Sequence, residues 1–384
     1  MKLMESRSSS LTIVHCNATL EVAHAHFVRA AHRHDSGDWI LIHPEWISKL
    51  TVRPDMWSKV LEVLDTRPEY GNINRRMRAN LARFEAEIPF ASYQRIELVV
   101  SDLFWLMNNV LVAKLAALCS SRGSEFSLTI MDEGSVLYST RLGLRRILRS
   151  FAKYAYITLH GFPALFVHSA NVNYLHPLCK RVLCLHPKLL NVPLGLSVEA
   201  IRPELLKEVY GDSLPALELP RHSCLYLSQP LYKLVGEERQ LKVVRAFKRN
   251  LEEQGIRHFF YKPHHADLPS WCDILERECG LVPLQFRKMV AFELLAPKCS
   301  AEVVVSHTTS ALLNLRAYGY HGRVIACGID ELSGAFAERS QYDDFCRCLR
   351  TLGSVEWMDT GRHRPSAGVG ATDPPRALAR KETT

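Results

Sequence analysis

Residues 95–133 read RIELVVSDLFWLMNNVLVAKLAALCSSRGSEFSLTIMDE, and this stretch decides the fold class. Two short runs rich in apolar and β-branched residues, 95–101 and 127–133, predict strands, and the longer segment 108–123 between them predicts a helix. A strand, a helix and a second strand in this order form a βαβ unit, whose two strands are parallel. The stretch therefore predicts an α/β fold with a parallel sheet.

The same alternation continues in both directions along the chain. Predicted helices at 237–255 and 308–319 each end at a glycine, which is a frequent helix stop. Two α/β halves of similar length predict two Rossmann-like domains, with a ligand cleft between them and site residues at the carboxyl ends of the strands. The other predicted strands are 11–16, 38–44, 224–229, 257–263, 302–307 and 323–328.

Repeated prolines interrupt this pattern between residues 160 and 222. Because proline removes a backbone donor and breaks regular elements, we expect a domain boundary in this region. The predicted domains are 1–190 and 191–360. The tail at 361–384 is rich in Pro, Gly and charged residues, and we expect it to be disordered.

The composition is that of a globular protein. The chain has 384 residues and is 47% hydrophobic, but no uninterrupted apolar run reaches the roughly 18 residues of a membrane span. Its beginning has no apolar signal core, so we expect a cytoplasmic protein. The 11 cysteines are scattered singly, which predicts reduced core thiols and no metal site.

The net charge of +8 predicts an anionic partner without identifying it. The segment RLGLRRILRSFAKY at 141–154 places an apolar stripe and a basic face on one helix. This segment is either a solvated amphipathic helix or a contact with an anionic acceptor or an anionic membrane, and both interpretations stay open. No RRM, KH or helix-turn-helix signature accompanies the charge, so we expect no nucleic acid among the partners, and a basic nucleic-acid-binding protein remains the non-enzyme alternative.

Polar residues collect where predicted strands end. Asp132 and Glu133 directly precede Gly134, where the backbone can turn and leave a carboxylate facing a cleft. Such a carboxylate can take a proton from a hydroxyl, and the alternative is that it caps the following turn. In SHTTS at 306–310, hydroxyls and free amides at a helix start suit a phosphate, and plain N-capping is the alternative.

The segment YKPHH at 261–265 follows another predicted strand. Pro263 restricts the local chain, so we expect Lys262 and His264 to project to one side and His265 to the other. A cation beside an imidazole suits a phosphate leaving group, and surface polarity is the alternative. No carboxylate partner lies at metal-ligand spacing, and neither the P-loop nor the dinucleotide-binding motif occurs in the chain.

Taken in order, DEG (132–134), KPHH (262–265) and SHTTS (306–310) resemble the motifs of bacterial sialyltransferases with the GT-B fold. The similar families are glycosyltransferase family 52 and the polysialyltransferases of family 38. They carry a [DE]-[DE]-G motif in the first domain, then a histidine-proline motif and a Ser/Thr cluster in the second. The stretch LYLSQPL (225–231) also resembles the start of their donor-binding domain, whereas His265 stands where these families have proline.

The resemblance implies roles for individual residues. Asp132 is the expected base that deprotonates the acceptor hydroxyl, with Glu133 as the alternative. His264 is expected to act at the donor phosphate as an acid or hydrogen-bond donor, and Lys262 to add positive charge there. Glu293 resembles the carboxylate that holds the ribose. The remaining expected donor-binding residues are Ser228, Gln229, His265, Ser306, Thr308 and Thr309.

The resemblance also implies a reaction. The expected activity is inverting transfer of sialic acid from CMP-sialic acid to a hydroxyl of a surface glycan, such as lipooligosaccharide or capsule, with neither a metal nor another cofactor. The first domain is expected to hold the acceptor and the second the CMP-sugar donor. Transfer of another CMP-activated 2-keto sugar acid (Kdo, legionaminic or pseudaminic acid) and polysialic acid synthesis are the alternatives. Peripheral contact with the inner membrane and a homodimer are further expectations.

Overall fold

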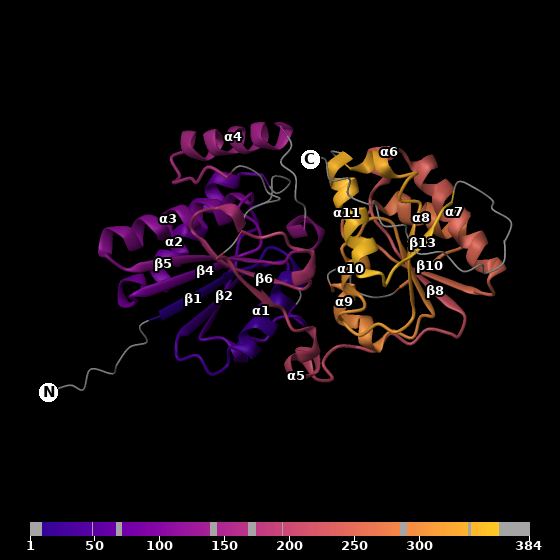
Figure 1. Cartoon of the computed structure of the whole chain (residues 1–384), viewed down its shortest axis with the longest axis horizontal. Helices are drawn as coiled ribbons and strands as arrows, with labels where there is room; N and C mark the ends of the chain where they lie inside the picture. The colour runs from indigo at the N-terminus through magenta and orange to yellow at the C-terminus, as the bar shows by residue number, and fades with distance from the viewer. Residues whose placement is uncertain are drawn as a thin grey trace, which may run out of the picture.

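The computed structural model describes residues 10–47, 49–66, 71–138, 144–167, 174–193, 195–284, 290–336 and 339–360. It contains two parallel β-sheets with their helices, one formed by the N-terminal half of the chain and one by the C-terminal half (Figure 1). The predicted α/β class with two Rossmann-like halves is thus confirmed. The predicted disordered tail lies outside the described residues.

The first sheet has seven strands in the order β3-β2-β1-β4-β5-β6-β7, and all neighbouring pairs are parallel. The chain builds outward from β1 on one side and then returns to its other side, so the order reverses between β1 and β4. The strands are β1 (Ser10–His15), β2 (Asp38–Pro44), β3 (Lys59–Val63), β4 (Arg95–Val100), β5 (Glu125–Met131), β6 (Cys179–Cys184) and β7 (Ser197–Ala200).

The βαβ unit predicted from residues 95–133 forms β4, α3 and β5. Its helix ends at Gly123, whose φ of 67° lies in the left-handed region that suits glycine. The helices of this half are α1 (Thr19–Ala31), α2 (Ile73–Glu87), α3 (Leu106–Arg122), α4 (Leu144–Leu159) and α5 (Leu206–Tyr210). Short 3₁₀ helices are η1 (Pro54–Met56), η3 (Phe90–Ser92), η4 (Ser135–Tyr138), η6 (Pro187–Leu189) and η7 (Pro203–Leu205).

The second sheet has six strands in the order β10-β9-β8-β11-β12-β13, again all parallel, and its order reverses between β8 and β11. The strands are β8 (Ser223–Leu227), β9 (His258–Lys262), β10 (Val282–Pro283), β11 (Val303–Ser306), β12 (Arg323–Cys327) and β13 (Glu356–Met358). The helices are α6 (Tyr232–Val235), α7 (Glu237–Glu253), α8 (Pro269–Cys279), α9 (Phe292–Leu295), η8 (Ala296–Lys298), α10 (Ala311–Asn314), η9 (Ser333–Ala335) and α11 (Arg339–Leu352).

The structure differs from two expectations about element bounds. Strand β7 pairs with β6, so the first sheet extends beyond the predicted boundary between residues 190 and 191. The predicted helix at 308–319 contains only the four-residue α10, after which the chain continues in turns to Gly319. The proline-rich region between 160 and 222 therefore contains two strands of the first sheet, β6 and β7.

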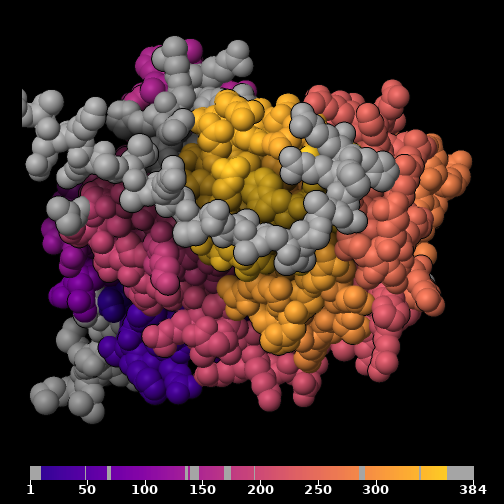
Figure 2. Space-filling model, turned by 45° about the vertical axis from the view of Figure 1, so that its right-hand side comes forward, coloured from indigo at the N-terminus to yellow at the C-terminus, as the bar shows by residue number. Residues whose placement is uncertain are grey.

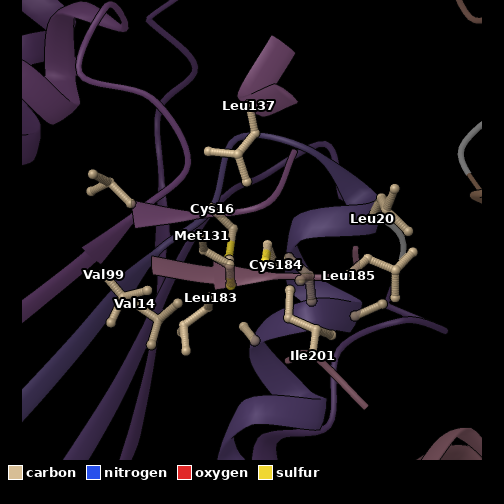
Figure 3. Packing of buried hydrophobic residues seen from close by; sticks show 14 of the residues in the cluster. Val14, Cys16, Leu20, Val99, Met131, Leu137, Leu183, Cys184, Leu185 and Ile201 are labelled. Carbon is tan, nitrogen blue, oxygen red and sulfur yellow. The ribbon is translucent and has the colours of Figure 1, made fainter. Parts of the chain in front are cut away.

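Apolar packing supports the loop that follows β5. Met131 at the end of β5 lies among Cys16, Leu137, Leu183 and Cys184 (Figure 3). The same buried cluster continues into the C-terminal half through residues of β8, α9 and α10, so apolar contacts join the two halves. Figure 2 shows the two halves in direct contact on one face of the molecule. None of the eleven cysteines forms a disulfide, in agreement with the prediction of reduced thiols.

Candidate functional site

The carboxyl ends of the two sheets meet at the domain interface. Gly134, which follows β5, lies against Ser310, which follows β11: a Cβ added to Gly134 would be 2.7 Å from the Cβ of Ser310. The φ of Gly134 is 126°, a conformation that side chains disfavour. Glycine is therefore required here both by the backbone and by the close approach of the other domain, and two of the predicted motifs are in contact.

Asp132 is held on every side by hydrogen bonds. Its side chain is 1% exposed, and its Oδ1 accepts the N–H of Gly134 at 2.7 Å. Its Oδ2 accepts the N–H of Leu185 at 2.9 Å and the hydroxyl of Tyr138. The Asp132 backbone carbonyl accepts Nδ1 of His24 at 2.9 Å. Asp132 thus ties the DEG loop (residues 132–134) to β6, η4 and α1.

Glu133 points into different surroundings and keeps part of its surface exposed. Burial raises the pKa of its carboxyl well above the usual range, and the negative charges of Asp102 and Glu21 raise it further. Burial also raises the pKa of Glu21 to about 7, although its Oε2 accepts the N–H of Asn17 at 2.6 Å. We call Glu21, Asp102 and Glu133 the acidic group. These side chains come from α1 and from the ends of β4 and β5.

A pocket opens beside the acidic group, at the carboxyl ends of β1, β2 and β3. Asn17, Asp65 and Trp105 line it together with His15 and other residues. Because the Asn17 N–H is bonded to Glu21, the pocket and the acidic group are neighbours. The volume of this pocket is about 10 Å³, so it holds little more than one water molecule.

The loop after β9 is a tight turn, which contradicts one expectation. The backbone N–H of His264 donates to Oδ2 of Asp267 at 2.8 Å, and the N–H of Asp267 donates to the carbonyl of His264 at 3.0 Å. As a result the rings of His264 and His265 lie 4.1 Å apart. The prediction that they point to opposite sides is wrong, because the chain turns here and does not stay extended.

The His264 ring has a defined hydrogen-bonding state. Its Nδ1 accepts the N–H of Ala266 at 3.1 Å, so the neutral ring carries its proton on Nε2. Burial, together with the nearby charges of His265, Lys262 and Lys233, lowers the pKa of His264 to about 4. At neutral pH, His264 is therefore a neutral ring with an Nε2–H group to donate.

Lys262, at the end of β9, lies near two buried carboxylates. Burial lowers the pKa of its ammonium, and the negative charges of Glu293 and Asp267 oppose that shift. Glu293 is 6% exposed, and burial raises its pKa against the opposing effects of Lys262 and Asn314. The structure thus places Lys262, His264 and Glu293 in one neighbourhood, as the sequence predicts.

Four predicted residues lie at the reversal point between β8 and β11: Ser228, Gln229, Ser306 and Thr308. Gln229 Oε1 accepts the backbone N–H of Thr308 at 2.7 Å and its hydroxyl at 3.2 Å, so this pair joins the two strand ends. The side chain of Ser228 is buried beside the Tyr226 hydroxyl. Ser306 is fully buried and donates to the carbonyl of Leu227 at 2.7 Å, which leaves this hydroxyl out of reach of a ligand.

Thr309 begins no long helix. Its Oγ1 accepts the N–H of Ala311 at 3.3 Å, and α10 ends at Asn314. The residue directly before α10 is Ser310, whose side chain makes no capping hydrogen bond, and a helix of four residues supplies no long dipole to a phosphate.

Polar side chains that the sequence analysis missed converge between the domains. We call them the interface polar cluster: His24 from α1, His186 after β6, Asn314 from α10, and Tyr318. Nε2 of His24 and the Tyr318 hydroxyl are buried without a hydrogen-bond partner among the described residues, whereas His186 and Asn314 interact with each other.

This cluster connects the predicted residues of the two domains. His24 stacks on Tyr318 with ring centroids 6.2 Å apart, and Tyr318 lies within electrostatic range of both Asp132 and Glu293. Buried polar groups are normally paired, so unpaired ones that converge mark a site for a polar ligand. The available sequence signal was the His-Pro pair at 186–187, which follows β6 as KPHH follows β9.

Within the described part of the chain, no group of three His, Cys, Asp or Glu side chains could hold a metal ion. No helix in that same part is long and apolar enough to cross a membrane.

We compared the chain with protein-family models, curated proteins and solved structures. No protein-family model and no curated protein matches the chain. An α/β-galactoside α-2,3-sialyltransferase from the luminous marine bacterium Photobacterium phosphoreum is similar in structure, with a TM-score of 0.51 and 12% identity over 91% of this chain and 99% of that chain. The chain has the GT-B fold.

The same fold also occurs with other chemistry. A UDP-N-acetylglucosamine 2-epimerase, described as putative, from Listeria monocytogenes matches with a TM-score of 0.50 and 11% identity over 89% of this chain and 91% of that chain. The GT-B likeness therefore fixes the architecture, and the choice of reaction depends on the site residues.

Proposed function

We propose that the protein is an inverting, metal-independent glycosyltransferase that moves sialic acid from CMP-sialic acid to a hydroxyl of a surface glycan. The observation that carries this proposal is the contact between the DEG loop and Ser310, because it brings the two halves of the predicted site together. The order of the motifs along the chain selects a CMP-sugar donor. Kdo, legionaminic and pseudaminic acids have the same CMP linkage and are the other donors to test.

The C-terminal domain supplies the donor site. The Nε2–H of His264 and the ammonium of Lys262 face the phosphate and stabilise the charge that grows on CMP as it leaves. Glu293 holds the ribose hydroxyls from its buried position beside Lys262. Since His264 is neutral at pH 7, it acts as a hydrogen-bond donor to the phosphate.

The N-terminal domain supplies the base, and we assign this role to Glu133. Both carboxylate oxygens of Asp132 are already bonded to Gly134, Tyr138 and Leu185, so we assign Asp132 the role of holding the loop. Glu133 lies in the acidic group, and its raised pKa makes it a stronger base once it is ionised. This order reverses the one that the resemblance implies.

The acceptor hydroxyl oxygen forms a bond to the anomeric carbon while the bond from that carbon to the CMP phosphate oxygen breaks. The hydroxyl proton goes to Glu133, and the electron pair of the broken bond leaves with CMP. The acceptor approaches Glu133 from the side of the acidic group. We place this reaction on the cytoplasmic side of the inner membrane.

The test is a donor screen with CMP release as the readout, in the presence of EDTA. The purified chain is incubated with each CMP-sugar acid and a panel of lipooligosaccharide and capsule acceptors, with UDP-N-acetylglucosamine as the epimerase control. Acceptor-dependent CMP release supports the proposal. Epimerisation of the UDP-sugar, or no rise in melting temperature across a CMP titration, overturns it.

The same assay separates the two acidic residues. We expect Glu133→Gln to lower kcat by about a hundredfold or more without lowering the melting temperature or the response to CMP. We expect Asp132→Asn to lower the melting temperature, because it weakens three hydrogen bonds. An Asp132→Asn protein that keeps its stability and alone loses turnover would return the base to Asp132.

A further inference from the structure

Helix α4 presents apolar side chains to solvent. Leu148, Phe151 and Leu159 are 61%, 62% and 84% exposed, although such residues are usually buried. Their spacing of three and eight residues puts them on one side of the helix, with Ala152 and Ala155 between them. We call these five residues the α4 stripe.

The opposite side of α4 attaches the helix to the domain. Ser150 and Ile157 are buried, and Lys153 donates to the carbonyl of Phe104 while its ammonium lies 3.7 Å from the Phe104 ring centroid. Figure 1 shows α4 as the outermost element of the N-terminal half. The helix is thus anchored by one face, and the α4 stripe is turned away from the protein.

Nearby aromatic residues extend the apolar surface. Phe166 is 38% exposed, and its ring packs edge-on against Phe151 at 6.4 Å and against Tyr154 at 6.0 Å. This arrangement holds Phe151 in place at the surface. Contiguous exposed apolar surface of this kind marks an interaction site.

The charge of the surrounding sequence identifies the kind of partner. Between Glu133 and Glu199 the chain contains no Asp or Glu, whereas the first half of α4 and the residues before it contain Arg141, Arg145, Arg146 and Arg149. Arg149 is exposed beside the stripe. An exposed apolar stripe with Arg149 beside it, in a segment rich in arginine and without Asp or Glu, suits a partner that is both apolar and anionic.

We propose that α4 docks on an anionic phospholipid bilayer, with the α4 stripe in the headgroup and acyl boundary and Arg149 at the lipid phosphates. An apolar face flanked by Arg or Lys is the pattern of helices that lie in the membrane interface. A second copy of the chain fits less well, because two such faces would bring arginines together without carboxylates to pair them.

The docked orientation also bears on the acceptor, and this step depends on the proposed function. Lys153 lies within electrostatic range of Asp102 of the acidic group, so the anchored face of α4 adjoins the acceptor side of the site. A bilayer beneath the α4 stripe therefore lies close to the acidic group. An acceptor glycan carried on a membrane lipid would reach the site from that surface.

Vesicle co-sedimentation tests the docking without any assay of transfer. We expect the full chain to sediment with vesicles of phosphatidylcholine containing roughly one-third phosphatidylglycerol, and to remain in solution with phosphatidylcholine alone. Raising the salt concentration should release it, because screening weakens the attraction of the arginines. No binding to the mixed vesicles, or equal binding to both kinds, overturns the proposal.

Substitutions locate the contact. We expect Leu148→Ser with Leu159→Ser to lower the vesicle partition coefficient by about tenfold or more, since two leucines no longer enter the interface. The matched control is Leu234→Ser with Leu268→Ser, which removes two leucines that are 66% and 47% exposed in the C-terminal half. That control should bind vesicles as the unmodified chain does. Equal loss in both pairs overturns the assignment to α4.

The Leu148→Ser and Leu159→Ser pair could fail to fold, so a single charge substitution provides a second test of the contact. Arg149→Glu should weaken binding to the mixed vesicles several-fold, whereas Arg277→Glu on the exposed surface of α8 should not. Sedimentation velocity without lipid tests whether a second copy of the chain covers the α4 stripe instead. A dimer that the Leu148→Ser and Leu159→Ser pair dissociates would overturn membrane docking in favour of self-association, whatever the outcome of the donor screen.

Discussion

At the scale of single residues, Gly134 allows the DEG loop of the first domain to contact Ser310 of the second domain. It needs a positive φ, and it leaves room for Ser310 of the other domain. We expect Gly134→Ala to lower transfer by at least about tenfold, because the added methyl group collides with Ser310 and pushes the DEG loop away from the donor site. Steady-state kinetics of the purified variant measure this loss.

Two further variants separate the collision from backbone strain. Gly123→Ala introduces a side chain at another positive φ, 67°, with nothing within 4 Å, so it should cost stability but leave the kinetic constants unchanged. Ser310→Gly added to Gly134→Ala removes the atom that is struck and should recover part of the activity. If the double variant is no more active than Gly134→Ala, the collision is not the cause.

Glu21 gives the acidic group a measurable effect on stability. Its pKa is about 7 in the folded chain, above its ordinary value of 4.5, so the protonated form is favoured by folding. That stabilising contribution is complete below pH 4.5 and is lost as the pH rises through 7. Glu21→Gln, which stays neutral and still accepts the Asn17 N–H, should therefore melt like the unmodified chain at pH 4.5 and higher at pH 8.

The expected gain is on the order of 3 kcal/mol at alkaline pH, from a shift of between two and three pKa units. Thermal melts across this pH range provide the measurement. Glu253→Gln, at an exposed position at the end of α7, is the matched control and should leave the pH dependence of melting unchanged. A constant difference between Glu21→Gln and the unmodified chain at every pH would contradict the explanation.

At the scale of elements, the buried central strands were predictable and the edge strands were not. β2 was predicted with its bounds and β1, β4 and β8 to within one or two residues, because strands buried on both faces read as continuous apolar runs. The four edge strands β3, β7, β10 and β13 were missed, and so was β6, which lies next to β7. They are short or mixed in composition, and their pairing depends on neighbours far away in the sequence, which local pattern does not record.

Some features of the candidate site were likewise predictable from the sequence, and others were not. The residues at the strand ends were identified because a polar cluster after an apolar run is a local signal, and the structure places Asp132, Lys262 and Glu293 around one interface. The side-chain partners that decide their chemistry were not predictable. The Tyr138 hydroxyl that binds Asp132 and the turn that stacks His264 on His265 exist only in the folded chain.

At the scale of the whole molecule, the two domains share an apolar cluster but bury unpaired polar groups between them. Leaving a buried hydroxyl without a partner costs about 1–3 kcal/mol, so the free protein is less stable than its contacts would permit. Such groups are expected where a ligand supplies the missing partners on binding. Tyr318, which stacks on His24 across the interface, is the clearest case.

We therefore expect Tyr318→Phe to raise the melting temperature of the free protein and to reduce the further rise that CMP produces. Tyr320→Phe is the control, because the Tyr320 hydroxyl donates to the carbonyl of Ala301 at 2.7 Å. Removing that bonded hydroxyl should lower the melting temperature and leave the response to CMP unchanged. If Tyr318→Phe instead destabilises the free protein, its hydroxyl already has a partner there; if CMP stabilises this variant fully, the ligand binds without contacting the interface polar cluster.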